Sequence, residues 1–187
     1  MASDIVDDAN TVVKNFNHEQ QVVNKNYLSP VEYRFGVKKL PYTSFFVQNV
    51  NLPGISLGKI DQPTPFVPIP VQGDHLTFNP LALTFRVDED LGNWLEVYHW
   101  IRNSGVLKMD EYRQISRQPK TSGAGLKSEL NLAILTNRKN GNFNVTLHDG
   151  WPYALSDLGF TTMDTTVAYL EATVSFAYTY YDIEKFT

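Results

Sequence analysis

Cysteine is absent from this 187-residue chain, which excludes a disulfide scaffold and any thiolate-based zinc or iron–sulfur site. A basic excess is also missing, because 16 Lys and Arg stand against 20 Asp and Glu, a net charge of −4. This balance argues against a protein that grips nucleic-acid phosphates. No apolar run approaches the ~20 residues of a membrane helix, and the N-terminus lacks a signal-peptide pattern. We therefore expect no membrane association and folding in a reducing cytosol.

Charge of either sign is scarce as well. Charged residues make up 19% of the chain, whereas about 25% is usual for a globular protein. Aromatic residues reach 13%. Either the core is large for this length, or other subunits cover part of the surface.

The pattern of apolar residues divides the chain into an N-terminal arm, residues 1–28, and one domain, residues 29–187. In the arm, apolar side chains recur at helical spacing. They are Ile5, Val6, Ala9, Val12, Val13 and Phe16. The arm is interpreted either as an amphipathic helix that docks on a neighbour or as a frayed terminus.

Alternating apolar residues predict a mainly β domain. The expected strands cover 33–37, 45–50, 81–87, 130–134, 143–147 and a long final strand over 170–180. Asn140-Gly141 predicts a type I′ turn, and Trp151-Pro152 opens an irregular stretch that ends at Phe160. Helical spacing predicts one helix over about 91–103, with Asp90 as its N-cap and Gly105 at its end.

A proline-rich segment between these strands has a different character. Four prolines between Pro63 and Pro70 exclude a central strand, because proline has no N–H to donate. The segment is predicted to be an extended loop or an edge element. Its apolar residues, which are Phe66, Val67, Ile69 and Val71, indicate a contact role.

Residues that could carry chemistry are few. His148-Asp149 offers an acid–base pair, but no Gly-x-Ser-x-Gly motif supplies a nucleophile. Asp88-Glu89-Asp90 lacks the spacing of a calcium loop, and a helix cap accounts for it. We therefore predict a protein that is not an enzyme and needs no metal or cofactor. Two alternatives stay open: a monomeric β-sandwich binding module with Trp94, Trp100 and Trp151 as its platform, and a hydrolase using His148 and Asp149.

The order of several motifs resembles a known family. The chain runs from the Asn51–Gly54 turn through the proline-rich loop to Val71-Gln-Gly73-Asp74, followed by Leu76-Thr-Phe, strand 81–87 and the Trp- and Tyr-bearing helix. Gly150-Trp151-Pro152 and a terminal Tyr178-Thr-Tyr-Tyr181 complete the order. Over about residues 30–183 this pattern is similar to the tail tube protein family of contractile-tailed bacteriophages, whose fold is also similar to the type VI secretion tube protein.

The resemblance implies an antiparallel β-sandwich or half-open barrel with one flanking helix. It also implies a structural subunit of the virion tail, assembled in the host cytoplasm as stacked hexameric rings that conduct DNA during ejection. The implied partners are further copies of the chain and the sheath, baseplate and tape-measure proteins. The long arm and the basic-leaning loop 106–128 leave open a baseplate tube initiator or a tube terminator.

Within that expected tube, two sets of residues receive roles. The lumen of a DNA conduit should be neutral or mildly acidic, so that DNA slides without binding. The polar side of the final strand is predicted to face the lumen: Glu171, Thr173, Ser175 and Thr179. Contacts between rings are predicted at Phe66, Val67, Ile69, Val71, Val12 and Phe16.

Overall fold

The structure, a computed structural model, describes residues 26–105, 126–163 and 168–186. The chain is mainly β, as predicted, and its elements follow in this order: β1 Tyr33–Val37, α2 Pro41–Phe45, β2 Val47–Val50, β3 Ile55–Gln62, β4 Ile69–Phe78, β5 Leu81–Arg86, α3 Gly92–Ser104, β6 Ser128–Leu135, β7 Gly141–Leu155, β8 Glu171–Ala177 and β9 Tyr180–Lys185. The predicted N-terminal helix and most of loop 106–128 lie outside the described residues. Among those residues, no helix is long and apolar enough to span a membrane.

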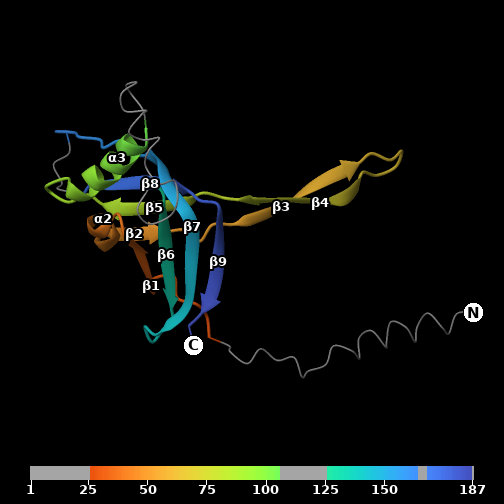
Figure 1. The fold of residues 1–187 in the computed structure, drawn as a ribbon, viewed down its shortest axis with the longest axis horizontal. Helices are drawn as coiled ribbons and strands as arrows, with labels where there is room; N and C mark the ends of the chain where they lie inside the picture. Colours follow the sequence, from red (N-terminus) through yellow and green to blue (C-terminus); the bar gives the residue numbers. More distant parts are fainter. Residues whose placement is uncertain (1–25, 106–125, 164–167, 187) are drawn as a thin grey trace, which may run out of the picture.

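Seven antiparallel strands form one strongly bent sheet. Its path runs β1-β6-β7-β8-β5-β2, and β9 pairs with β7 beside it. The first part of β7 pairs with β6 and β9, and its last part, from Trp151, pairs with β8. One strand therefore belongs to both halves of the body (Figure 1). The path does not close, since β1 and β2 are its two ends, and this confirms the half-open barrel.

The core lies between the two halves of this bent sheet. Large side chains from facing strands are fully buried there, among them Leu83, Phe85, Leu130, Val145 and Phe176. They alternate with exposed or half-buried neighbours, as in β8, where Ala172, Val174 and Phe176 point inward. Period-two alternation is what a sheet with one buried face requires, and it is why these strands were predicted correctly.

The bend in β7 lies at Asp149 and Gly150. Asp149 has a left-handed φ of 57°, and a Cβ on Gly150 would lie 2.7 Å from the Leu130 side chain. Only glycine fits such a close approach. The prediction that the chain becomes irregular at Trp151 is wrong, because the strand continues through the bend to Leu155.

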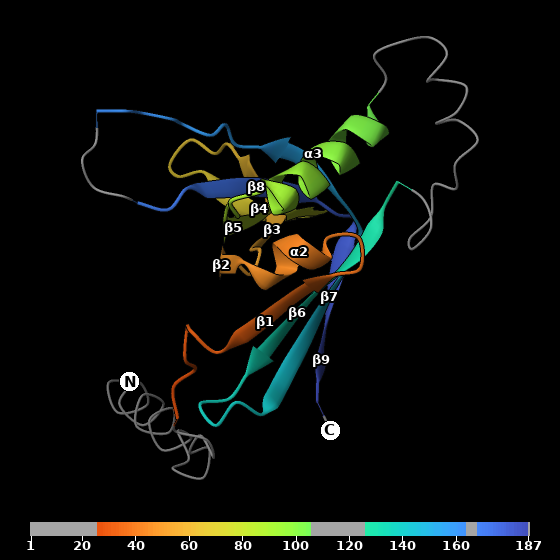
Figure 2. The same ribbon diagram turned by 90° about the vertical axis from the view of Figure 1, so that its left-hand side faces the viewer.

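Helix α3 matches the predicted helix within one residue at each end and stops at Gly105 (Figure 2). Its start differs from the prediction. Leu91, at a left-handed φ of 56°, precedes the helix, and no side chain caps it, so Asp90 is not an N-cap. The predicted strand over 45–50 also begins later, because Pro41–Phe45 forms the short helix α2. The Glu96 carboxylate of α3 accepts the Thr43 N–H of α2 at 3.0 Å, which ties the two helices together.

Asn93 fixes the entry into α3. Its side chain is fully buried, donates to the Arg86 carbonyl at 2.6 Å and accepts the Asp88 N–H at 3.3 Å. We expect Asn93→Ala to lower the free energy of unfolding by about 1–3 kcal/mol, since it leaves two backbone groups without their partner. Urea denaturation measures this loss. Asn103→Ala, at an exposed position of the same helix, serves as the control; equal losses in the two variants would contradict the assignment.

Two details of the remaining strands also correct the predictions. The β6–β7 hairpin forms as expected, but its turn spans Thr136–Asn140, with Lys139 at a left-handed φ of 63°, and is not a two-residue Asn140-Gly141 turn. The long strand predicted over 170–180 is two strands. The chain leaves β8 at Ala177, bends at Thr179, and then pairs with β7 as β9.

Candidate functional site

Strands β3 and β4 form a separate two-stranded hairpin that projects from the body (Figure 1). The prolines predicted an extended loop or an edge element here. In the structure, Pro63, Pro65 and Pro68 lie in the tip between the strands, and Pro70 lies within β4. The hairpin is thus longer and more regular than the prolines indicated. Proline is tolerated because a two-stranded sheet consists of edge strands.

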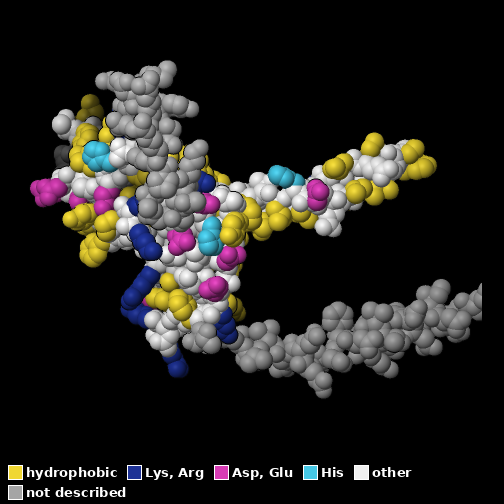
Figure 3. Space-filling model, viewed as in Figure 1, with side chains coloured by type: hydrophobic (Ala, Val, Ile, Leu, Met, Phe, Trp, Pro, Cys, Tyr) yellow, Lys and Arg dark blue, Asp and Glu magenta, His cyan; other side chains and the backbone are white. Residues whose placement is uncertain are grey.

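Apolar side chains cover much of this hairpin (Figure 3). Phe66 at the tip is 95% exposed and Ile60 in β3 is 69% exposed. The other exposed apolar residues along it are Ile55, Leu57, Val67, Ile69, Val71 and Leu76. Contiguous exposed apolar surface of this kind marks an interaction site. All four predicted contact residues of the proline-rich segment lie on the hairpin.

Aromatic residues hold the base of the hairpin against the body. The Phe78 ring lies 6.1 Å from that of Tyr178 and 5.6 Å from that of Tyr181. The Tyr178 hydroxyl donates to the Asn79 carbonyl at 2.7 Å, and the Tyr181 hydroxyl donates to that of Pro53 at 3.2 Å. The bend between β8 and β9 therefore anchors both strands of the hairpin.

Burial, and secondarily the neighbouring Tyr181, raises the pKa of Tyr178 to about 12. The Tyr178 hydroxyl thus keeps its proton at every pH at which the protein would work. It therefore remains a donor to the Asn79 carbonyl.

A second candidate surface is the outer face of β2, β5 and β8. Directly opposite residues of antiparallel strands share a face. Asn49, Thr84 and Thr173 form one row across the three strands, with the Thr84 and Thr173 hydroxyls 3.3 Å apart. Ala82 and Ser175 form the next row. The structure brings three of the predicted lumen residues together on this face, namely Glu171, Thr173 and Ser175.

The charges on this face are paired. Arg86 lies opposite Glu171 in the ladder, and its guanidinium stacks 3.8 Å from the centre of the Tyr169 ring. With its amide oxygen turned toward Arg86, Gln48 accepts from Arg86 and donates to Glu171 at 2.6 Å. The positive charge of Arg86 on this face is therefore balanced by the neighbouring Glu171. The surface is polar and close to neutral.

The remaining candidate residues do not join these surfaces. Thr179 lies in the bend after β8 and not on the polar face of that strand. Val12 and Phe16 lie outside the described residues. His148 places its Nε2 3.1 Å from Asp182 and stacks on Tyr180, so it does not pair with Asp149. Among the described residues, no group of three or more His, Asp or Glu is arranged to hold a metal ion.

The three tryptophans do not form one platform. Trp100 is buried in the core, where it packs on Phe176 and donates to the Leu126 carbonyl at 2.7 Å. Trp94 stacks on Tyr98 within α3, and Trp151 lies near Tyr153 on β7. The aromatic site that the binding-module alternative requires is therefore not assembled.

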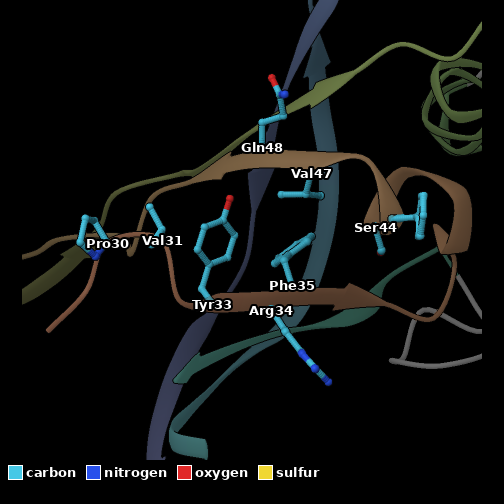
Figure 4. A pocket seen from close by; sticks show the side chains of 9 residues that line it. Pro30, Val31, Tyr33, Arg34, Phe35, Ser44, Val47 and Gln48 are labelled. Carbon is cyan, nitrogen blue, oxygen red and sulfur yellow. The ribbon is translucent and has the colours of Figure 1, made fainter. Parts of the chain in front are cut away.

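A cleft that the sequence did not predict lies at the seam of the half-open barrel. A space of about 710 Å³ lies between β1 and β2. Tyr33 and Phe35 from β1 and Val47 from β2 point into it, whereas Arg34 points away (Figure 4). No local pattern predicts this cleft, because strands distant along the sheet path form its two walls.

Comparison with known proteins agrees with the fold. No family model matches the chain. The chain is 28% identical to the tail tube terminator protein of Enterobacteria phage T4 over 142 residues, which are 74% of this chain and 76% of that protein. Its structure resembles the tube-terminating cap of the anti-feeding prophage, with a TM-score of 0.57, 11% identity, and coverage of 91% of this chain and 99% of the other. It also resembles a chain of the sheath–tube complex of an extracellular contractile injection system, PVC, in the extended state. That TM-score is 0.50 at 10% identity, with the same coverage.

Proposed function

We propose that this chain is a member of the tail tube protein family of contractile-tailed bacteriophages and that it builds the ring that terminates the tail tube. The observation that carries the choice is its 28% identity, over 142 residues, to a phage tail tube terminator protein. The role is structural and uses no catalytic residue. A second candidate, the repeated tube subunit, is favoured by the projecting apolar hairpin, which suits a chain that contacts many copies of itself.

In either role, six copies would form a ring around a lumen through which DNA passes. The sheath, baseplate and tape-measure proteins would be its partners in the virion tail. Subunits in such a ring bury much surface, and interface cores are depleted of charge. The 19% charged residues of the chain are consistent with this.

Negative-stain microscopy of the purified chain separates the two roles. Single rings that do not grow are expected for a terminator. Long tubes would contradict termination and support the tube subunit. A compact monomer at high concentration, measured by light scattering, would contradict both.

Contacts to the adjacent ring are assigned to Phe66, Val67, Ile69 and Val71 of the hairpin, and to Val12 and Phe16 of the N-terminal arm, residues 1–28. The exposure of the four hairpin residues supports their role in contacts between rings. For the arm, the test is deletion of residues 1–25. Rings that then fail to bind the tail tube are expected, and unchanged binding would remove the arm from the assignment.

The lumen wall is assigned to the face that carries Glu171, Thr173 and Ser175. We expect Glu171→Lys to slow DNA release from assembled particles without preventing ring formation. A lysine near a phosphate gains roughly 1 kcal/mol at 4 Å in water, or about fivefold per contact. Release followed by dye fluorescence measures the rate.

The matched control for this variant is Glu184→Lys, at an exposed position of β9. Ring yield and melting temperature confirm that both variants assemble. An equal effect of the two charge reversals, or none at Glu171, would place Glu171 outside the lumen.

A further inference from the structure

Among the described residues, the hairpin and the cleft both present strand edges without a neighbouring strand. Strands β3 and β4 pair only with each other, and β1 and β2 each pair on one side only. A two-stranded hairpin alone in water is marginally stable at best. Its length, with strands of eight and ten residues, therefore points to an additional partner that covers it.

Edge β1 is ready to accept another strand. The Leu135 N–H donates to the Glu32 carbonyl at 3.0 Å. Bonded and non-bonded pairs alternate along an antiparallel ladder, so the backbone groups of Tyr33 and Phe35 point away from β6, along the free edge of β1. Edge β2 is less suitable, because a bulge at Gln48 interrupts its ladder.

Strand β3 is the better donor of the hairpin. Residues 55–62 contain no proline, so every one of them carries an N–H, whereas Pro70 in β4 lacks one. Its exposed Ile60 offers an apolar side chain. The cleft offers the side chains of Tyr33, Phe35 and Val47 to receive it (Figure 4).

The two segments that carry these surfaces also have net charges of opposite sign. The hairpin has a net charge of −1, from Lys59, Asp61 and Asp74. Residues 30–48 have a net charge of +2, from Glu32, Arg34, Lys38 and Lys39. Opposite charge steers two surfaces together and suppresses other pairings.

We propose that β3 of one copy occupies the β1–β2 cleft of a second copy of this chain and extends the sheet at β1. The hairpin of one copy and the cleft of the next copy are different surfaces of the chain, so the contact is heterologous. Contacts of this kind generate rings or stacks rather than closed dimers. The inference rests on the proposed ring assembly and identifies which surfaces join the copies.

Cysteine cross-linking tests the contact, and the chain has no native cysteine to interfere. One population carries Ile60→Cys on the hairpin, and the other, with a size tag, carries Val31→Cys at the rim of the cleft, where Val31 is 75% exposed. Both sites are exposed, so folding should be unaffected. A short bis-maleimide is expected to join the two populations in assembled particles. His99→Cys, exposed on α3, replaces Val31→Cys in the control and should give no product.

Microscopy of the same samples separates the two proposals. Rings or tubes without the Ile60–Val31 product would overturn the hairpin–cleft contact and leave ring assembly standing. An equal yield of cross-linked product with His99→Cys would also overturn the hairpin–cleft contact. Cross-linking of Phe16→Cys to Val31→Cys in place of Ile60→Cys would assign the cleft to the N-terminal arm and overturn the contact as well. A chain that stays monomeric overturns both proposals.

Discussion

Replacing residues 58–75 by an Asn-Gly turn is expected to abolish ring assembly while the body stays folded. Leu57 and Leu76 lie directly opposite each other, so a two-residue turn can join them. The replacement removes the exposed apolar residues from Ile60 to Val71 but keeps Phe78, which packs on Tyr178 and Tyr181. Light scattering should report a monomer, and circular dichroism should report an intact β fold.

A matched control for this shortening keeps the hairpin and changes only its charges. Lys59→Gln with Asp61→Asn removes the weak 3.9 Å ion pair between two exposed side chains, which contributes less than about 1 kcal/mol. This variant should assemble. A shortened chain that still forms rings would show that the hairpin does not hold the copies together.

Phe85→Ala is expected to have the largest effect on folding. Phe85 lies on β5, between β8 and the end strand β2, and is fully buried. Truncating a buried phenylalanine removes apolar contacts and leaves a cavity, which costs about 3–5 kcal/mol. A domain is typically stable by about 5–15 kcal/mol, so this loss would consume much of the total. Urea denaturation measures it as a lower midpoint.

Thr173→Ala gives the comparison for Phe85→Ala. Thr173 lies on the neighbouring strand but on the exposed face, and its hydroxyl bonds that of Thr84. Losing one such hydrogen bond costs about 0.5–1.5 kcal/mol. If the two variants lost similar stability, the assignment of the core to the inner face of β5 would be wrong.

The elements that sequence predicted well are those whose pattern reflects burial. Helix α3 buries one stripe that includes Val97 and Trp100, and β8 buries every second residue. Where an element has no buried face, the spacing of apolar residues no longer predicts its secondary structure. Strands β3 and β4 are exposed along nearly their whole length, so no alternation between core and solvent selected their residues.

Predictions about the candidate surfaces were also correct only where the residue pattern reflects burial. Alternation placed Glu171, Thr173 and Ser175 on one face of β8, and this holds because Ala172, Val174 and Phe176 are buried opposite. It could not show that the strand ends before Thr179, since the polar and aromatic residues continue in register through the bend. The cleft could not be predicted from the sequence, because it depends on the distance between β1 and β2, the two ends of the sheet path.

The two ends of the sheet path, β1 and β2, belong to different halves of the sheet. Strand β7 is the one shared element of both sheet halves, and its bend at Asp149 and Gly150 sets the angle between them. Gly150, whose missing side chain makes room for Leu130, therefore lies at the joint between the two sheet halves, and β1 and β2 are the free ends of those halves. A methyl group added at Gly150 would press on the buried Leu130 side chain, at the point where the two sheet halves are joined.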